Sequence, residues 1–400
     1  MRPDYDVIVV GAGPGGATAA RCCAEGGLKT LLVEKEKLPR YKPCGGCLSP
    51  KAVKLVPFDL SPVVENVIFG ARFTYCLKDP ISIKTENPIG YMVMRDRFDQ
   101  FLTEKGLEKG VDLIEANKVI RVEEGRGGIE IRLAKGERFH CRHLIGADGP
   151  NSVVARSFSL KAPRDSGGGM AIESEIPFEV TEDFPKTELS FIHLDFGGVP
   201  NGYGWVFPKR KCLSIGIGGM FEAGKTMNPR RYYDLFAGKL PYLKVKTKEV
   251  VGHPLPAFYD GAQKASRGRV LLVGDAAHLM DPLMGEGIYY AIRSGLLAAE
   301  AIIESKDDSI SPSEIYEASL QHHLFSNLKG ALYFSRFVFR FTRLAYFTFK
   351  RYPELGHFYV QVLEGTETYP GFVAKVKARM KDLLGGRLSE KIKKAMVQSV

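Results

Sequence analysis

Residues 4–34 decide the fold and read DYDVIVVGAGPGGATAARCCAEGGLKTLLVE. Their first part, at 5–10, is an apolar, β-branched run of the kind found in a strand buried on both faces. The glycine pattern G-x-G-x-x-G follows at 11–16, then an alanine-rich helical segment, then a second apolar run at 28–33. An acid, Glu34, stands eighteen residues after the last glycine. This order predicts a Rossmann-like strand–turn–helix–strand unit that binds a dinucleotide.

Each residue type in the turn has a physical task. Gly11 allows the tight turn, Gly13 lets the backbone approach a pyrophosphate, and Gly16 lets helix and strand pack closely. The helix N-terminus faces the anion, and Glu34 is placed to accept hydrogen bonds from ribose hydroxyls. The unit alone does not distinguish FAD from NAD(P).

Composition sets broad limits. A chain of 400 residues with 44% hydrophobic and 26% charged residues suits a globular protein of two or three domains. We expect no secretory signal and no membrane-spanning run, and reduced thiols for the seven cysteines. The net charge of +10 favours anionic partners.

A basic loop rich in proline and glycine follows Glu34 and contains the C-x-x-C pair Cys44 and Cys47. A metal site is disfavoured, because the chain offers no second matching pair. A thioredoxin-like redox pair would want its first cysteine at a helix N-terminus, whereas Pro43 and the glycines favour a loop. Two thiols in a close-approach loop, or direct contact with a cofactor or substrate, are the alternatives that remain.

Two later segments place an acid at the end of an apolar strand. Asp148 follows the strand at 144–147, and Asp275 follows the strand at 270–274. Acids at the carboxyl ends of such strands lie at the edge where α/β proteins bind ligands. His278, one turn after Asp275, is a catalytic candidate, although a structural role is favoured.

Glycines precede a helix that starts at Ile288. Gly285 and Gly287 lie just before its N-terminus, where backbone amides can reach an anion or a ring carbonyl.

The middle of the chain has short β-patterns. Strands are expected at 67–75 and 81–85 around a turn at 78–80, before a helix with Arg95 at its start. Four alternating runs at 170–221 predict an antiparallel sheet inserted in the dinucleotide-binding domain.

One of these runs carries aromatic residues at alternate positions. Tyr203, Trp205 and Phe207 would fall on one face of a strand. They would form either sheet core or an aromatic wall that faces a cofactor or an apolar substrate.

The last hundred residues are expected to be helical. No acid occurs from Ala318 to Pro353, where Arg and Lys interleave with Phe and Tyr. This mixture suits a helix at a membrane surface or the mouth of a tunnel for a lipid with an anionic head, and core packing is the alternative. No nucleic-acid recognition motif accompanies the charge. The basic residues are Arg336, Arg340, Arg343, Lys350 and Arg351.

Three dispersed motifs carry a resemblance to a known superfamily. They are G-x-G-x-x-G with Glu34, GADG at 146–149 and GDA at 274–276 with GEG at 285–287. The trio resembles the p-hydroxybenzoate hydroxylase-type flavoproteins, which bind FAD.

Two further features are similar to the geranylgeranyl reductase family within that superfamily. They are KPCGG at 42–46 and the string P-x-x-Y-x-W-x-F-P-K at 200–209. Halogenases usually carry W-x-W-x-I-P, and the corresponding YGWVFP at 203–208 argues against them. Cys47 departs from the family, which more often has glycine or alanine there.

The resemblance implies a FAD site of dispersed residues. The glycine turn and Glu34 would hold the ADP half, with Arg95 and Val119 beside the adenosine and pyrophosphate. The loop at 42–47 would close over the flavin, and residues 285–288 would face its ring. The implied set is Gly11, Gly13, Gly16, Ala17, Glu34, Lys35, Cys44, Gly45, Cys47, Arg95, Val119, Asp148, Asp275, Gly285, Gly287 and Ile288.

The resemblance also implies a reaction, the saturation of C=C bonds in geranylgeranyl or polyprenyl chains. An archaeal-type digeranylgeranylglycerophospholipid is slightly preferred over geranylgeranyl diphosphate, chlorophyll esters or a menaquinone chain. Cys44, Tyr203 and Trp205 are the catalytic candidates that would shape the isoprenoid cavity. The electron donor, whether NAD(P)H, ferredoxin or another carrier, is open. The rivals are a FAD monooxygenase and a quinone-linked electron-transfer flavoprotein.

The expected fold class is α/β (α+β overall). It comprises a Rossmann-like FAD-binding domain at 1–165 with 262–300, an inserted antiparallel β-sheet substrate domain at 166–261 with a contribution from about 66–92, and a C-terminal helical region at 301–400. We expect a cytoplasmic protein that is peripheral at the membrane, with an isoprenoid lipid substrate and no metal or nucleic acid.

Overall fold

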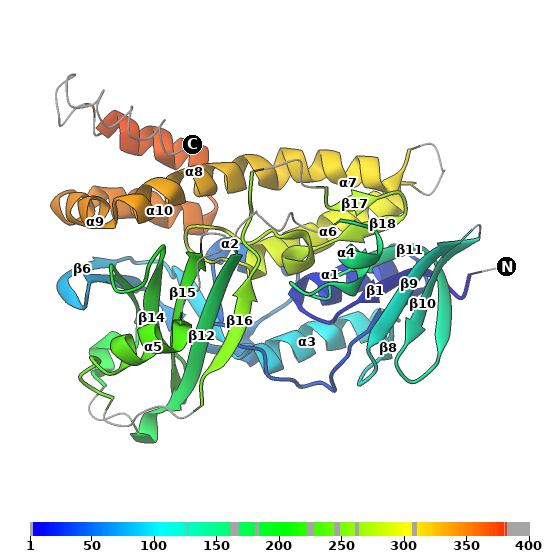
Figure 1. Cartoon of the computed structure of the whole chain (residues 1–400), viewed down its shortest axis with the longest axis horizontal. Coiled ribbons are helices and arrows are strands. Elements are labelled where there is room, and N and C mark those ends of the chain that lie inside the picture. The colour runs from blue at the N-terminus through cyan, green and yellow to red at the C-terminus, as the bar shows by residue number, and fades with distance from the viewer. Residues whose placement is uncertain are drawn as a thin grey trace.

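The structure, a computed structural model, describes residues 3–125, 127–160, 168–180, 184–221, 228–243, 249–260, 264–305, 310–379 and 381. Two large sheets lie side by side, and helices of the C-terminal part run along the top of both in Figure 1. This arrangement confirms the predicted α/β class with a second sheet and a helical C-terminal region.

The first sheet contains the glycine-turn unit. β1 (Tyr5–Val10) pairs in parallel with β2 (Thr30–Val33) and β11 (Arg138–Gly146). The strand order is β17-β18-β11-β1-β2-β8, with β10 and β9 beside β11. Because β18, β11, β1, β2 and β8 are parallel, their carboxyl ends meet at one edge. The other strands are β8 (Asp112–Ile114), β9 (Val119–Gly125), β10 (Gly128–Leu133), β17 (Ser266–Arg267) and β18 (Val270–Leu272).

Helices pack against this sheet at close range. α1 (Pro14–Glu25) contacts both α3 (Arg95–Leu107) and α6 (Ile288–Glu304). A Cβ at Gly295 would lie 2.4 Å from the carbonyl oxygen of Gly15, so the backbones of α6 and α1 touch. The short helices α2 (Pro50–Val53) and α4 (Val153–Ser157) complete this part.

The second sheet has seven strands in the order β16-β12-β15-β14-β13-β5-β6. The four runs predicted at 170–221 pair antiparallel as expected, whereas the strand contributed from earlier in the chain, β5, joins β13 in parallel. β5 comes from much earlier in the chain, so no hairpin dictates its direction. Its strands are β5 (Gly70–Tyr75), β6 (Lys78–Lys84), β12 (Gly168–Pro177), β13 (Phe191–Phe196), β14 (Gly202–Pro208), β15 (Cys212–Phe221) and β16 (Val251–Leu255), and α5 (Pro229–Ala237) packs on β12 and β15.

The turn predicted at 78–80 is wrong. The β5–β6 hairpin turns at Cys76 and Leu77, whose φ angles are 51° and 61°. A tight hairpin needs two left-handed residues, which are normally Asn or Gly, so Cys and Leu at these positions do not signal a turn. The strand predicted at 67–75 divides, and its first part joins a three-stranded sheet of β3 (Cys47–Leu48), β7 (Gly90–Val93) and β4 (Val64–Ile68).

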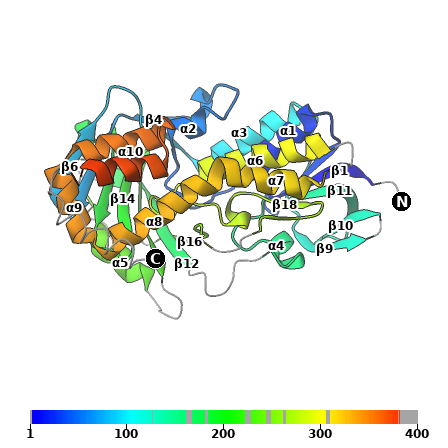
Figure 2. The ribbon, with the colours of Figure 1, turned by 90° about the horizontal axis from the view of Figure 1, so that it is seen from above.

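The C-terminal helices connect the two sheets. Seen from above in Figure 2, α8 runs from the side of the first sheet toward the second, where α9 and α10 lie. Their bounds are α7 (Pro312–Leu320), α8 (Ser326–Arg340), α9 (Thr342–Arg351) and α10 (Glu354–Glu364), and residues 369–379 are also helical. Across the described ranges, no helix combines the length and apolarity needed to cross a membrane. The predicted domain boundaries stay a prediction.

Candidate active site

The glycine turn after β1 is fixed by backbone contacts. At Gly11, φ is +103° and a Cβ would lie 2.4 Å from the carbonyl oxygen of Ala147. At Gly16 a Cβ would lie 1.9 Å from the Gly11 carbonyl oxygen. Gly13 differs, because a Cβ there would meet nothing within 4 Å. Packing therefore requires glycine at 11 and 16, whereas Gly13 leaves space in front of the α1 N-terminus.

Gly13 borders a cavity of about 260 Å³ that residues of both large sheets line. Its walls include the turn at 13–16, the loop at 42–49 and the segment at 280–288. The predicted residues that it brings together are Gly13, Gly16, Cys44, Gly45, Cys47, Arg95, Tyr203, Trp205, Asp275, Gly285, Gly287 and Ile288.

Six predicted residues lie outside this cavity wall. Gly11 shapes the turn, and the side chains of Ala17 and Val119 are buried in hydrophobic core. Lys35 is exposed to solvent. The remaining two, which flank the turn, are Glu34 and Asp148.

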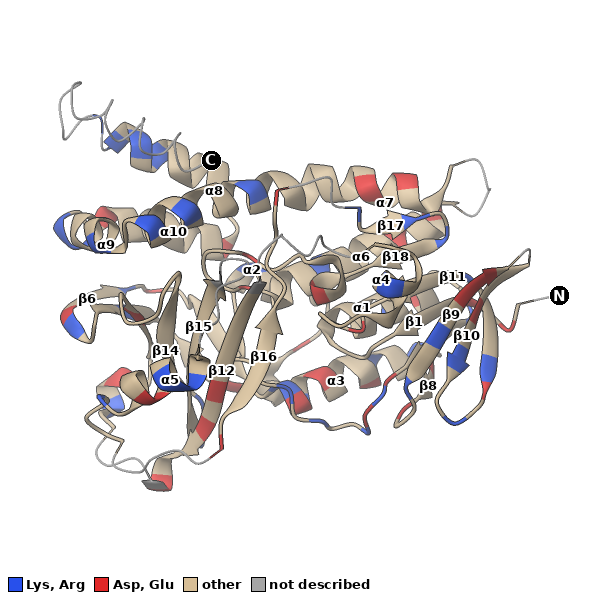
Figure 3. Ribbon diagram, in the orientation of Figure 1, with Lys and Arg blue, Asp and Glu red and all other residues tan. Residues whose placement is uncertain are grey.

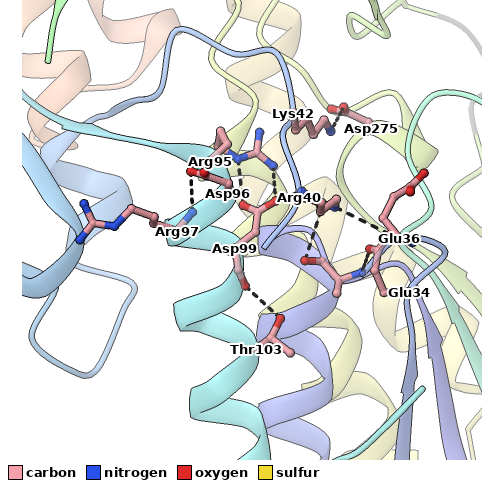
Figure 4. A network of polar contacts seen from close by, with 11 residues as sticks. Glu34, Glu36, Arg40, Lys42, Arg95, Asp96, Arg97, Asp99, Thr103 and Asp275 are labelled. Atoms are coloured by element: carbon pink, nitrogen blue, oxygen red, sulfur yellow. Dashed lines mark hydrogen bonds and ion pairs between the residues drawn. The ribbon is translucent and has the colours of Figure 1, made fainter. Parts of the chain in front are cut away.

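Charged residues beside the turn form one network, shown in Figure 4. The carboxylate of Glu34 accepts a hydrogen bond from the backbone N–H of Ala12 at 2.8 Å. Arg40 lies 3.7 Å from Glu34 and binds Asp99 at 2.8 Å. The Asp99 carboxylate also accepts hydrogen bonds from Nε and a terminal nitrogen of Arg95, each at 2.8 Å. Since a carboxylate has about four acceptor sites, Glu34 keeps capacity for ribose hydroxyls.

Arg95 is a fixed buried cation and not a surface residue. Burial lowers the pKa of Arg95, but the Asp99 carboxylate and the Cys44 side chain more than offset this, so its pKa is raised. Burial raises the pKa of Asp99, and Arg95 and Arg40 bring it below its usual range. Both partners are therefore charged, and the guanidinium reaches the cavity wall.

Asp275 lies between two basic side chains. Lys42 Nζ is 3.5 Å and His253 Nε2 is 3.6 Å from its carboxylate. Burial raises the pKa of Asp275, but Lys42 and His253 outweigh it and hold the pKa well below its usual range. His278 does not line the cavity; its backbone N–H donates to the Asp275 carbonyl and its ring packs against Tyr259. This placement agrees with the structural role for His278.

The cavity at the glycine turn, called the cofactor groove below, fits a dinucleotide with an anionic pyrophosphate. Asp148 Oδ2 accepts from the backbone N–H of Val153 at 2.6 Å, whereas the buried Oδ1 has no hydrogen-bond partner among the described residues. That oxygen is available to a ligand hydroxyl beside the turn. The space at Gly13 and the cations Lys42 and Arg95 suit a phosphate group. FAD carries both hydroxyl groups and phosphate groups.

The segment at 281–287 is anchored by buried side chains that the sequence analysis missed. Asp281 accepts hydrogen bonds from the Leu283 N–H at 2.7 Å and from the Tyr369 hydroxyl at 2.6 Å. Glu286 binds Lys51 at 2.7 Å. The Asp281–Tyr369 contact joins positions 88 apart, so no local spacing could have revealed it.

The predicted aromatic face is present. Rings of Tyr203 and Trp205 have centroids 6.4 Å apart, and those of Trp205 and Phe207 are 6.2 Å apart. Cys44 and Cys47 lie beside this wall as free thiols, and burial raises the pKa of Cys47 to about 12, so it is a neutral thiol. In the described parts of the chain, no cluster of His, Cys, Asp or Glu is placed to hold a metal ion.

A second, almost purely apolar cavity of about 340 Å³ adjoins the first. Strands β5, β6 and β13 form one wall, and helices α8, α9 and α10 form the other. No charged side chain of the described residues lines it. The residues that line both cavities are Ile89, Ile192, Leu194, Leu283, Met284, Tyr359 and Leu363.

Substitutions at two glycines separate folding from cofactor binding. Gly13→Ala adds a methyl group in open space, so we expect a folded protein that loses most of its FAD. Gly16→Ala forces a methyl group onto the Gly11 carbonyl, so we expect a large loss of folding stability. Thermal unfolding and the FAD absorbance of the purified variants measure these effects. Equal FAD content in Gly13→Ala and the unsubstituted protein would contradict the role of Gly13.

Comparisons with known proteins agree with this geometry. The family described as "FAD binding domain" matches residues 4–211 and 247–313. A digeranylgeranylglycerophospholipid reductase of Thermoplasma volcanium is 33% identical over 333 residues, covering 76% of this chain and 80% of that protein. A menaquinone reductase of Mycobacterium tuberculosis is 30% identical over 322 residues, covering 76% and 77%.

A solved structure shares the whole architecture. The crystal structure of a geranylgeranyl bacteriochlorophyll reductase-like protein of Thermoplasma acidophilum superposes with a TM-score of 0.77 at 26% identity, covering 95% of this chain and 99% of that one. The FAD-binding match, these relatives and the common fold lead to one assignment. The chain belongs to the geranylgeranyl reductase family of FAD-dependent oxidoreductases.

Proposed function

We propose that the protein saturates C=C bonds in the geranylgeranyl chains of a membrane lipid of the digeranylgeranylglycerophospholipid class. The observation that carries the proposal is the apolar cavity that adjoins the cofactor groove. Its volume of about 340 Å³ lies within the range of roughly 300–1,000 Å³ typical of small-molecule sites. A long hydrocarbon chain with no polar group suits such walls, whereas a small polar substrate would leave its hydrogen-bonding groups unpaired.

The family name of the Thermoplasma volcanium relative supports this substrate class. The menaquinone reductase relative supports the runner-up, a prenyl chain on a quinone. Both substrates combine an isoprenoid chain with a head group, and the cavity itself recognises the chain. A lipid with an anionic head is favoured because the surface near the cavity is basic.

The residues around the first cavity have distinct proposed tasks. When bound and reduced, FAD would supply a hydride. Gly13, Arg95 and Lys42 would hold its pyrophosphate region, and residues 285–288 would face its ring. Cys44 would close over it from the opposite loop.

The aromatic wall would act on the reacting chain. An isolated alkene has no carbonyl that could be polarised, so positive charge develops on carbon as the bond is protonated. The faces of Tyr203 and Trp205 would stabilise that charge by about 1–2 kcal/mol in a desolvated site. Tyr203 is fixed by a hydrogen bond from its hydroxyl to the Met284 carbonyl, and Trp205 is only 7% exposed. Fixed rings keep this geometry through successive turnovers.

A basic patch on the C-terminal helices suits contact with a membrane. Figure 3 marks Lys and Arg positions in blue along the ribbon of this part of the molecule. Arg336, Arg340 and Arg343 are exposed and form no ion pair with a described residue. Close to them, Leu344 and Phe347 are 55% and 38% exposed, although both are large and apolar. Cations beside exposed apolar side chains fit an anionic lipid surface.

The decisive test is an anaerobic reaction of the reduced holoenzyme with digeranylgeranylglycerophospholipid, in parallel with menaquinone. Mass spectrometry counts one added H₂ for each saturated bond. We expect saturation of the lipid without oxygen. A product that appears only with oxygen and carries an added oxygen atom would contradict the proposal and favour a monooxygenase, and saturation of menaquinone alone would favour the runner-up.

Filling the second cavity provides a variant test. Ala345→Trp on α9 places an indole in the chain cavity, so we expect lipid reduction to fall roughly a hundredfold while FAD binding is unchanged. Ala374→Trp, which adds the same group at an exposed helical position outside the cavity, is the matched control. Equal rates for the two variants would exclude this cavity as the chain site.

The membrane contact predicts a charge-dependent association with vesicles. Replacing Arg336, Arg340 and Arg343 together by Gln removes three cations, each worth about 1 kcal/mol at an anionic surface. We expect binding to phosphatidylglycerol vesicles to weaken roughly a hundredfold in a sedimentation assay.

The control is a triple Gln variant of Arg121, Arg138 and Arg142, which are exposed basic residues of the first sheet. It changes net charge by the same amount, and its binding should change little. If both triple variants lost affinity equally, the patch would not be the contact surface.

A further inference from the structure

The proposed reaction needs a proton source that none of the roles described so far supplies. Saturation of a C=C bond forms one C–H bond with a hydride from reduced FAD and one with a proton. The electron pair comes from the flavin, which a reduced carrier of the NAD(P)H or ferredoxin class then restores. A cavity with apolar walls holds little water, so an acid of the protein has to stand at its edge.

We propose that Glu173 donates this proton and that Tyr41 returns a proton to it from solvent. The inference rests on the proposed function. Glu173 lies on β12, is 2% exposed and lines the first cavity. Its Oε1 accepts from the backbone N–H of Cys44 at 2.5 Å and from the Tyr41 hydroxyl at 3.2 Å. The carboxyl group is therefore fixed at the loop that faces the cofactor groove.

The same carboxyl group is linked to the aromatic wall. Its Oε2 accepts a hydrogen bond from the Ser214 hydroxyl at 3.0 Å. The Ser214 oxygen in turn accepts a hydrogen bond from Trp205 Nε1 at 3.2 Å. One hydroxyl group thus separates Glu173 from the indole that would stabilise the developing cation. A proton released on this side of the cavity meets the chain where its charge is stabilised.

Tyr41 provides the route to solvent. Its side chain is 49% exposed, and its hydroxyl can accept a proton from water while it passes its own to Glu173. The other buried acid of the cavity, Asp281, has no such route through its hydroxyl partner, since Tyr369 is 0% exposed. Repeated turnover requires reprotonation, which favours Glu173.

The remaining acids of the cavity contact basic side chains. Asp275 faces Lys42 and His253, and Glu286 binds Lys51. Each of these two carboxylates is therefore held in an ion pair with a lysine.

The electrostatic surroundings keep Glu173 protonated to higher pH than an ordinary glutamic acid. Burial raises its pKa; Lys209 and the Cys44 N–H lower it, Glu175 raises it, and the result is a raised pKa. Lys209 is itself paired with Glu175 at 2.8 Å, so its charge is largely compensated. Proton donation should therefore persist at low pH and be lost as pH rises through this raised pKa.

Glu173→Gln tests the proposal with little structural change. The glutamine oxygen still accepts from Cys44 and Tyr41, and its amide can donate to Ser214, but it carries no acidic proton. We expect lipid reduction to fall by about 10²–10⁴-fold. The high-pH limb of the wild-type rate profile should vanish, while the FAD absorbance is unchanged. Tyr41→Phe should slow repeated turnover more than a first single turnover.

A readout independent of turnover is the infrared band of a protonated carboxyl group in the holoenzyme. We expect the band to lose intensity in Glu173→Gln relative to wild type, whereas the control Glu130→Gln, on β10 of the first sheet, should keep the wild-type intensity. A band of unchanged intensity in Glu173→Gln, or a variant that reduces lipid at the wild-type rate, overturns the assignment of Glu173. If the wild-type protein shows the band but saturates no prenyl chain, the proposed function is wrong. The protonation of Glu173 would still stand in that case.

Discussion

The rest of the structure depends on backbone contacts that only glycine allows at the first turn. Gly11 and Gly16 bring α1 against the end of β1, and a Cβ at Gly15 would lie 2.8 Å from the carbonyl oxygen of Ala291 on α6. These contacts fix both helices relative to the strand ends. The α1 N-terminus, Asp275 and the segment before α6 consequently face one groove, so that a single set of close contacts determines where the cofactor lies.

The segment at 281–287 connects this groove with the rest of the molecule. It lines both cavities, and its anchors come from opposite directions: Lys51 from the first part of the chain and Tyr369 from the last. Removing one partner of such a buried contact leaves an unsatisfied polar group, so the arrangement is specific. The shapes of the two cavities are therefore set together.

Features that depend only on residues close together in the sequence could be predicted from local patterns. The strand–glycine–helix unit, the acids at 34, 148 and 275, and the shared face of Tyr203, Trp205 and Phe207 follow from spacing and alternation. The family resemblance added FAD and the reductase assignment. Most of the site residues named from the sequence line one cavity.

Features that depend on long-range packing could not be predicted in this way. Glu173 is one of two acids in its strand, and its partner Tyr41 is 132 positions away. The parallel pairing of β13 with β5 and the hairpin turn at Cys76 and Leu77 leave no composition signal. In the basic, aromatic C-terminal segment, aromatic rings line the apolar cavity while the arginines remain exposed, a division that composition alone does not reveal.

The central claim is that the cofactor groove and the apolar cavity form one site for FAD and an isoprenoid chain. A crystal structure of the holoenzyme with a bound geranylgeranyl lipid tests it most directly. We expect continuous density for the chain from the face of Trp205, past Leu194 and Met284, to the space between β13 and α9. Density for the chain elsewhere on the protein, with this cavity empty or filled by side chains, would contradict it.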